Sequence, residues 1–259
     1  MTLNLKDKVV IVVGAAGTIG SAVAKEFAKE GAKVVAADIR AAELNEVAEA
    51  IKAEGGEVTA IEVDVRKMDS VKAMVAKTVE IYGRVDNLTN AAGVQGNIAH
   101  RAELQDYDDD LWHDVIATDM TGVFYCVKTV AAQMVAQGQG GSITNIASAK
   151  GLIPSKLQCA FAAAKAGVIN FTKAVGMEMA PDGIRINVIA AGDVENAEVS
   201  KVDADSLALM KSHIPSGEIA RADDFVGICC FLATDAASYI NGAVIPVDAA
   251  WTSGYSRDF

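Results

Sequence analysis

Five consecutive β-branched residues, Val9–Val13, run directly into the glycine-rich segment Gly14-Ala15-Ala16-Gly17-Thr18-Ile19-Gly20. A continuous apolar run of this kind predicts a strand that is covered on both faces, because a half-exposed strand would alternate apolar and polar residues. Residues Ile19–Glu30 then have helical spacing and end at Gly31. Glycines let the backbone approach a pyrophosphate, whose charge is stabilised by amide N–H groups at a helix N-terminus. The start of the chain therefore predicts a strand, a phosphate-binding turn and a helix.

The same alternation of strand-like and helical segments continues to the end of the chain. Further strands are predicted at Lys33–Asp38, Glu57–Val63, Asn87–Asn90, Ser142–Ala147, Arg185–Ala190 and Ala243–Val247. Helical segments are predicted at Ala42–Glu54, Ser70–Tyr82, Leu157–Ala180 and Ala222–Ala233, with a long helix within Asp108–Gln137. Repeated β-α-β crossovers predict an α/β fold, a doubly wound parallel sheet of about seven strands with helices on both faces.

The organisation is that of one domain over residues 1–259, since no linker or internal repeat divides the chain and 51% of it is apolar. Residues 192–216 break the alternation with a polar stretch and a short possible helix. Ligands of such sheets bind beyond the carboxyl ends of the strands, so this segment is a candidate substrate lid. Residues 248–259 form a polar, aromatic tail that can cover a pocket or reach a neighbouring subunit.

Charge and composition exclude several classes of partner. The formal net charge of −11 argues against a nucleic-acid or anionic-membrane surface. No apolar run of about 18 residues predicts a membrane span, and no signal peptide is evident, so we expect a cytoplasmic protein. The four cysteines lack metal-ligand spacing; Cys229 and Cys230 are expected to be small buried hydrophobic residues, and no metal site is predicted.

The second predicted strand ends at Asp38, eighteen residues after Gly20. A carboxylate at this point can accept hydrogen bonds from the adenosine ribose hydroxyls and repels a 2′-phosphate. This favours NAD over NADP as cofactor, although Arg40, two residues further on, would weaken the preference.

A third feature combines Ser148, after the strand Ser142–Ala147, with Phe161 and Lys165 in the following helix. Together with the glycine-rich turn, this layout resembles the short-chain dehydrogenase/reductase family, whose signature is Ser, then Tyr-x-x-x-Lys. The resemblance covers the chain to about Val247 and implies a Rossmann-type fold. The chain departs from the family pattern at the tyrosine position and at several others: Val13, Thr18, Ala91, Asp119, Phe161, Ala164, Ala191 and Asn196.

The resemblance also implies which residues bind the cofactor. These are Gly14, Gly17, Thr18, Ile19, Gly20, Asp38, Asp64, Val65, Asn90, Ala91, Ala92, Lys165, Gly192 and Val194. In the family, Asp64-Val65 would contact adenine, Asn90-Ala91-Ala92-Gly93 would close over the cofactor, and the backbone of Gly192–Val194 would meet the nicotinamide amide.

For the chemistry, the resemblance implies the catalytic positions Ser148, Phe161, Lys165 and Asp119. The family's tyrosine exchanges a proton with the substrate oxygen, its lysine lies one helical turn away on the same face, and its asparagine, here Asp119, carries a water relay. Phe161 can neither donate nor accept a proton, so the reaction would lose the rate enhancement of general acid–base catalysis, about 10²–10⁴-fold. A desolvated Asp119 would be one replacement acid; Tyr107, Tyr125, His100 and Tyr255 are others.

The sequence is compatible with three functions. The first is an NAD(H)-dependent oxidoreductase that interconverts a secondary alcohol and a ketone and is impaired by Phe161. The second is a lyase or isomerase using Asp119, Ser148 and Lys165, and the third is a silent NAD-binding pseudoenzyme. A small polar substrate is expected from the loop residues Gln95, Asn97, His100, Arg101 and Lys150. The two long helices, within Asp108–Gln137 and Leu157–Ala180, carry many small apolar residues. In the family that the chain resembles, these helices often pair with a second subunit, so the resemblance implies a homo-oligomer, a dimer or tetramer.

Overall fold

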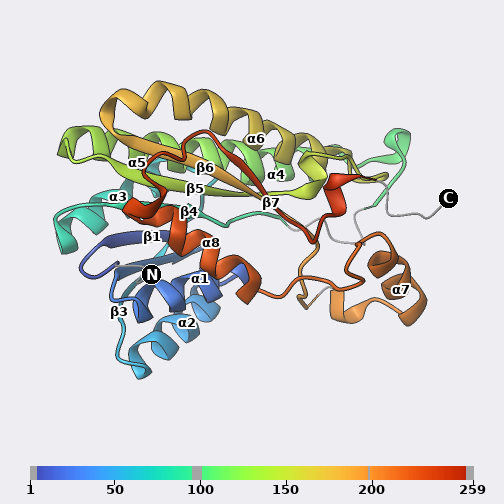
Figure 1. Cartoon of the computed structure of the whole chain (residues 1–259), viewed down its shortest axis with the longest axis horizontal. Helices are drawn as coiled ribbons and strands as arrows, with labels where there is room; N and C mark the ends of the chain where they lie inside the picture. The colour runs from blue at the N-terminus through green and yellow to red at the C-terminus, as the bar shows by residue number, and fades with distance from the viewer. Residues whose placement is uncertain (1–4, 95–100, 198, 255–259) are drawn as a thin grey trace.

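A seven-stranded, fully parallel sheet forms the centre of the molecule (Figure 1), in a computed structural model that describes residues 5–94, 101–197 and 199–254. The strand order is β3-β2-β1-β4-β5-β6-β7, so the chain reverses its winding direction between β1 and β4. The bounds are β1 (Val9–Val13), β2 (Lys33–Asp38), β3 (Glu57–Glu62), β4 (Asn87–Asn90), β5 (Gly141–Ser148), β6 (Ile184–Ala191) and β7 (Val244–Val247). This is the predicted α/β, doubly wound sheet, and each strand lies within one residue of its predicted bounds.

Helices cover both faces of the sheet (Figure 1). One face packs against α1 (Thr18–Lys29), α2 (Ala41–Ala53) and α8 (Asp223–Ala233). The other packs against α3 (Met68–Tyr82), α5 (Gly122–Gln137) and α6 (Cys159–Met179). The short α4 (Asp109–Ile116) packs on α6, and α7 (Ala204–Ser212) lies in the segment between β6 and α8.

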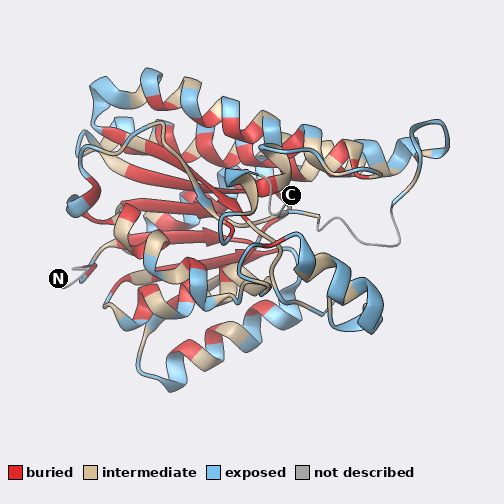
Figure 2. Cartoon of the chain, turned by 45° about the vertical axis from the view of Figure 1, so that its right-hand side comes forward, coloured by how far each residue is buried: buried red, intermediate tan, exposed pale blue. Residues whose placement is uncertain are grey.

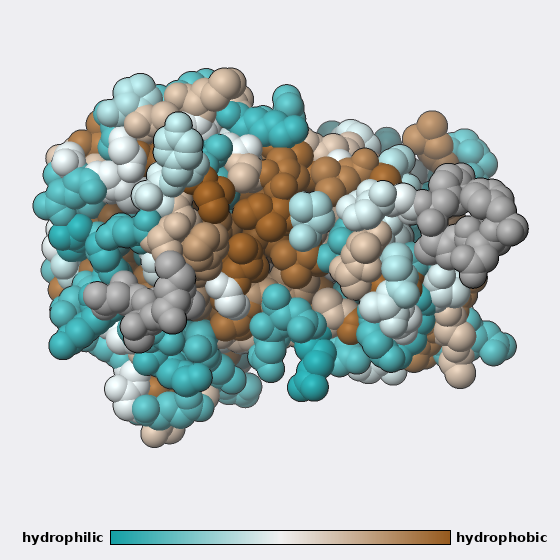
Figure 3. All heavy atoms as spheres, in the orientation of Figure 1, coloured by the Kyte–Doolittle hydropathy of each residue, from teal (hydrophilic) through white to brown (hydrophobic). Residues whose placement is uncertain are grey.

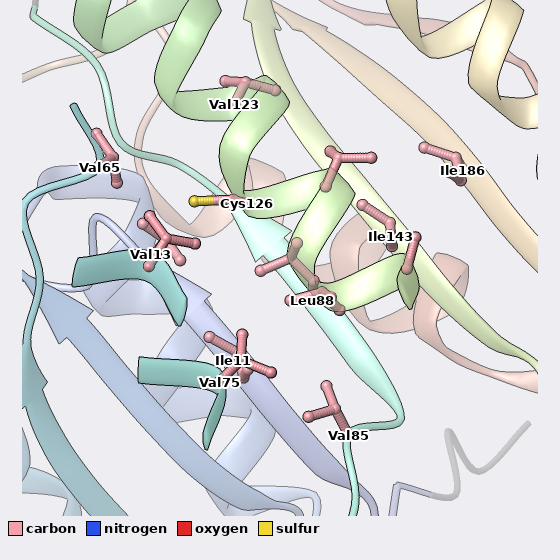
Figure 4. Packing of buried hydrophobic residues seen from close by; sticks show 14 of the residues in the cluster. Ile11, Val13, Val65, Val75, Val85, Leu88, Val123, Cys126, Ile143 and Ile186 are labelled. Carbon is pink, nitrogen blue, oxygen red and sulfur yellow. The ribbon is translucent and has the colours of Figure 1, made fainter. Parts of the chain in front are cut away.

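The buried residues concentrate in the strands and in the helix faces turned toward them (Figure 2). All five residues of β1 are buried, as its continuous β-branched sequence predicted. Figure 4 shows Ile11 and Val13 of this strand among aliphatic side chains from α3, β4 and α5. Burying such a side chain contributes roughly 1.5–3 kcal/mol relative to leaving it exposed. Cys126, Cys229 and Cys230 are buried free thiols, which confirms the expectation for the last two.

The helical stretch Asp109–Gln137 differs from a regular α-helix at one point. Ala117–Thr121 form a π-helical turn between α4 and α5, and Asp119 lies within it. Such a turn inserts an extra residue into the helix and is frequent at functional sites. By length and composition the whole stretch is apolar enough to cross a membrane, but α5 contacts α3, β4 and β5, so this is a core helix of the domain.

Candidate active site

A cavity of about 760 Å³ opens at the carboxyl ends of the strands, on both sides of the point where the winding reverses. This is where an open α/β sheet binds its ligand. The residues that follow β1 to β6 all contribute to its wall, as does Met210 of α7. Among the predicted site residues, the wall contains Gly14, Gly17, Thr18, Ile19, Asp38, Asp64, Val65, Ala91, Ala92, Ser148, Phe161, Lys165, Gly192 and Val194.

The glycine-rich turn is packed too closely to admit side chains at two positions. Gly14 has φ +83°, and a Cβ there would overlap the backbone of Ala91 and Ala92. A Cβ on Gly20 would overlap the carbonyl group of Gly14, so Gly20 lies below the wall and lets α1 approach the turn. Gly17 caps α1 in an extended conformation, which leaves the first amide groups of the helix directed at the cavity edge. This arrangement fits a diphosphate group.

Asp38 joins the end of β2 to this turn. The residue is 6% exposed, and its carboxylate accepts a hydrogen bond from Ala16 N at 3.0 Å and two from Arg40, at 3.0 Å from N and 3.3 Å from Nε. The contacts fix the carboxylate at the cavity wall as a hydrogen-bond acceptor. Arg40 also lines the cavity, so a positive charge lies beside the acid.

Asp64 binds Arg66, a residue that the sequence did not identify as part of the site. Arg66 donates to both carboxylate oxygens of Asp64, from Nε at 2.9 Å and from Nη2 at 3.2 Å, and its Nη1 donates to Asp114 at 2.9 Å. Hydrogen bonding to Arg66 lowers the pKa of Asp64 to about 2. The network ties the end of β3 to α4 across one side of the cavity.

A buried ion pair occupies the region where the resemblance places the chemistry. Lys165 Nζ lies 3.5 Å from Asp119 Oδ2 and 3.4 Å from the carbonyl oxygen of Ile146. Asp119 is fully buried, and its Oδ1 accepts a hydrogen bond from Val94 N at 2.6 Å. Among the residues that the structure describes, no group donates a hydrogen bond to Oδ2. Burial raises the pKa of Asp119, and the neighbouring charge of Lys165 opposes that shift.

The phenyl ring of Phe161 lies on the cavity side of this pair. Lys165 Nζ is 5.4 Å from the ring centre, within cation–π range. Both side chains line the cavity, whereas Asp119 lies behind Lys165 and outside the wall. The ring therefore occupies the position from which a phenol would reach the cavity, and it presents only carbon and hydrogen.

Ser148 lies at the end of β5, where its hydroxyl bonds to the backbone. Oγ donates to the carbonyl oxygen of Ala191 at 3.3 Å and accepts from Lys150 N at 3.2 Å. Beside it, Lys150 Nζ forms an ion pair with Asp193 at 2.8 Å and lies 5.9 Å from the ring centre of Trp251. The sequence did not predict this pair, because 43 residues separate its members; only the register of β5 and β6 brings them together.

Some predicted residues lie away from the cavity or outside the described chain. Asn90 is buried at the end of β4, where Nδ2 donates to Asn145 at 2.8 Å, so its side chain links strands. Tyr125 packs against Phe124 on α5, and Tyr107 belongs to the apolar cluster that includes Phe161, where burial raises its pKa. Arg101 lines the cavity.

The described residues contain no cluster of three or more His, Cys, Asp or Glu side chains that would suit a metal ion. Gln95, Asn97, His100 and Tyr255 lie outside the described residues.

A parallel sheet with a glycine-rich turn after β1, a buried acid at the end of β2 and a lysine facing the cavity is the arrangement of a dinucleotide-binding fold. The family model for short chain dehydrogenases matches residues 8–206. The chain is 34% identical over 254 residues to 2,5-dichloro-2,5-cyclohexadiene-1,4-diol dehydrogenase LinX of Sphingobium indicum, covering 98% of this chain and 100% of that one. It is 35% identical to cis-4-hydroxycyclohexanecarboxylate dehydrogenase of Sinomonas cyclohexanicum, covering 95% and 97%.

Among solved structures, a short-chain type dehydrogenase/reductase from Mycobacterium marinum superposes with a TM-score of 0.90 at 32% identity, covering 98% of each chain. The protein belongs to the short-chain dehydrogenase/reductase family, and the family resemblance stated from the sequence is confirmed. Its relatives are oxidoreductases that act on small molecules.

Proposed function

We propose that this chain is an NAD(H)-dependent oxidoreductase that interconverts a secondary alcohol and a ketone, and that Phe161 impairs it. The observation that carries the proposal is the position of the Phe161 ring, on the cavity wall and 5.4 Å from Lys165 Nζ. The cavity retains its glycine-rich turn, its acid and its lysine. The group that would exchange a proton with the substrate is missing at position 161, and Asp119 stands where the family has asparagine.

NAD is the cofactor that the wall fits best. The glycine-rich turn accepts a diphosphate, and the Asp38 carboxylate, anchored by Ala16 N at 3.0 Å, accepts hydrogen bonds from ribose hydroxyls. The same carboxylate repels a 2′-phosphate, which disfavours NADP. Lys165 would hold the nicotinamide ribose, and the backbone of Gly192 and Val194 would face the nicotinamide amide.

When bound, NAD supplies the acceptor or donor of the hydride. Ser148 orients the substrate oxygen, exchanging its long bond to Ala191 for one to the substrate. In the family the proton of that oxygen passes to a phenol, and Phe161 provides no such group. Loss of one general acid–base group lowers a rate by roughly 10²–10⁴-fold. The chain in this proposal therefore binds cofactor and substrate but turns over slowly.

The substrate we propose is a small alicyclic alcohol with further polar groups. The two curated relatives are named for a cyclohexadiene diol and a hydroxycyclohexane carboxylate, both ring compounds with a secondary hydroxyl. Lys150, half of an ion pair at the cavity wall, is a cation that a carboxylate on the substrate can reach by displacing Asp193.

Residues 192–216 form a lid in this proposal, supported by Asp193, Val199 and Met210 in the cavity wall. Within the described part of the tail, Asp248 accepts hydrogen bonds from Thr252 N and Oγ1.

We also propose that the protein is a cytoplasmic homotetramer. Apolar residues gather on the face that carries α8 and β7 (Figure 3), where the strand is only partly buried. The two long helices also carry exposed apolar side chains, with Met177 of α6 75% exposed and Val135 of α5 43% exposed. Exposed apolar residues in two parts of the molecule suit two kinds of subunit contact. A monomeric mass in solution would contradict this proposal.

The test of the proposed function is NADH production from NAD with a panel of cyclic diols, hydroxycyclohexane carboxylates and sugars. It is run on this chain and on Phe161→Tyr. The proposal expects turnover by the tyrosine variant and at least about 100-fold less by the natural chain. Equal activity of the two would show that another group supplies the proton. Binding of NAD without turnover by either would favour a silent binder or a non-redox enzyme.

A further inference from the structure

A buried pair of opposite charges lies behind the cavity wall at Lys165. Asp119 and Lys165 form a pair with their charged atoms 3.5 Å apart, and the two side chains are 0% and 7% exposed. A Cβ added to Gly93 would lie 3.2 Å from Asp119 Oδ1 and 3.2 Å from Lys165 Nζ, so the chain after β4 crosses directly over the pair. Little water reaches these atoms to screen them.

The net charge of the pair is zero wherever its proton lies. An ammonium beside a carboxylate and an amine beside a carboxylic acid both sum to zero. An asparagine at position 119, the residue that the family resemblance implies, would leave Lys165 as an uncompensated cation. The cavity wall at Lys165 therefore carries one positive charge fewer than it would with an asparagine at position 119.

We infer that Asp119 determines which redox state of the cofactor this protein binds, favouring NAD⁺ over NADH. The inference rests on the proposed binding of NAD with its nicotinamide ribose at Lys165. The oxidised nicotinamide ring carries a positive charge and the reduced ring does not, while the remaining charges of the cofactor are the same in both. Removing one positive charge from the wall thus favours the oxidised form selectively.

Coulomb's law gives the scale of the effect. Two unit charges roughly 6 to 12 Å apart, at an effective dielectric constant of about 20, change a binding constant by roughly ten- to hundred-fold. Water in the cavity reduces this, so we expect an effect of about tenfold on the ratio of the two dissociation constants.

The experiment measures Kd for NAD⁺ and for NADH by isothermal titration calorimetry, on the natural chain and on Asp119→Asn. Asparagine retains an oxygen that can accept from Val94 N, as Asp119 Oδ1 does at 2.6 Å. The expected result is a fall of about tenfold in the ratio Kd(NADH)/Kd(NAD⁺). Asp110→Asn, at an exposed position of α4, makes the same change in net charge at a residue that is not part of the cavity wall and should leave the ratio within twofold.

A double variant separates charge from shape. Asp119→Asn with Lys165→Met returns the pair to zero charge, so the ratio should return to within about threefold of the natural value, although both Kd values rise with loss of the ribose contact. Asp119→Ser serves in place of Asp119→Asn if thermal melting shows that the latter is unfolded. A change of less than threefold in the single variant, or a change that persists in the double variant, overturns the inference. Failure of both cofactor forms to bind the natural chain would instead refute the proposed function.

Discussion

Lys150 Nζ and Asp193 Oδ1 lie 2.8 Å apart in the cavity wall, joining the turn after β5 to the segment after β6. Both side chains are mostly buried, at 13% and 19% exposure. The pair forms part of the cavity wall, and the Trp251 ring of the tail lies 5.9 Å from the lysine nitrogen.

The pair predicts a dependence on substrate charge. In the Phe161→Tyr background, Lys150→Met should raise the KM for a hydroxycyclohexane carboxylate by about tenfold or more and leave the KM for a neutral cyclic diol nearly unchanged. Asp193→Asn is the matched control: it frees the lysine and should lower the KM for the carboxylate. Steady-state kinetics with the two substrates decide the question, and equal effects on both would show that the pair is purely structural.

Asp38 predicts cofactor selectivity. Asp38→Ser removes the charge that repels a 2′-phosphate and leaves Arg40, at present 3.3 Å from the carboxylate, available to it. Binding of NADP should tighten by roughly ten- to hundred-fold relative to NAD, measured by calorimetry. Arg40→Ala in the same background should cancel most of that gain. Unchanged selectivity would mean that Asp38 stabilises the glycine-rich turn through Ala16 N and does not bind the ribose.

Gly14 and Gly55 offer a matched pair for the glycine-rich turn. Both have φ +83°, but a Cβ on Gly14 would overlap Ala91 and Ala92, whereas nothing lies within 4 Å of a Cβ on Gly55. Gly55→Ala should cost only the roughly 1–2 kcal/mol of a left-handed residue. Gly14→Ala should cost more and abolish NAD binding, because the turn must move. Urea unfolding and calorimetry measure both effects; similar losses in the two variants would contradict the packing argument.

The Asp64–Arg66 contact predicts a pH dependence of stability. Hydrogen bonding to Arg66 lowers the pKa of Asp64 to about 2, below its ordinary value of 3.8. A lowered pKa means that the folded state binds the proton less tightly than the unfolded state. The stabilisation is therefore present above about pH 4 and is lost as the pH falls toward 2. Asp64→Asn should reduce the free energy of unfolding at pH 7, and the difference from the natural chain should shrink at pH 3.

The strands were predictable because their sequences carry the signal locally. Val9–Val13 is apolar throughout, and a strand covered on both faces requires that. The parallel, doubly wound arrangement follows from the β-α-β rhythm, whereas the strand order was not predicted. Gly14 and Asp38 follow from the same local reasoning, since the ends of parallel strands meet at one edge, and Lys165 was assigned to the site by the family resemblance.

Other features depend on contacts between distant residues and carry no local signal. The π-helical turn at Ala117–Thr121 lies inside what the sequence predicts as one long helix within Asp108–Gln137. Asn90 resembles a cofactor ligand in sequence, yet its Nδ2 donates to Asn145 on the neighbouring strand and the residue is not part of the cavity wall. Arg66 reaches Asp114 across 48 residues. Each arises from register and packing, which one sequence does not display.

We propose that Phe161 cannot transfer a proton to or from the substrate and that it leaves cofactor binding intact. The most direct measurement is the single-turnover rate of nicotinamide reduction, followed by absorbance at saturating NAD and alcohol, on this chain, Phe161→Tyr and Phe161→Leu. We predict a rate at least about 100-fold higher for the tyrosine variant alone, with Kd for NAD within threefold in all three proteins. Equal rates in the natural chain and Phe161→Tyr, at equal Kd, would contradict the account.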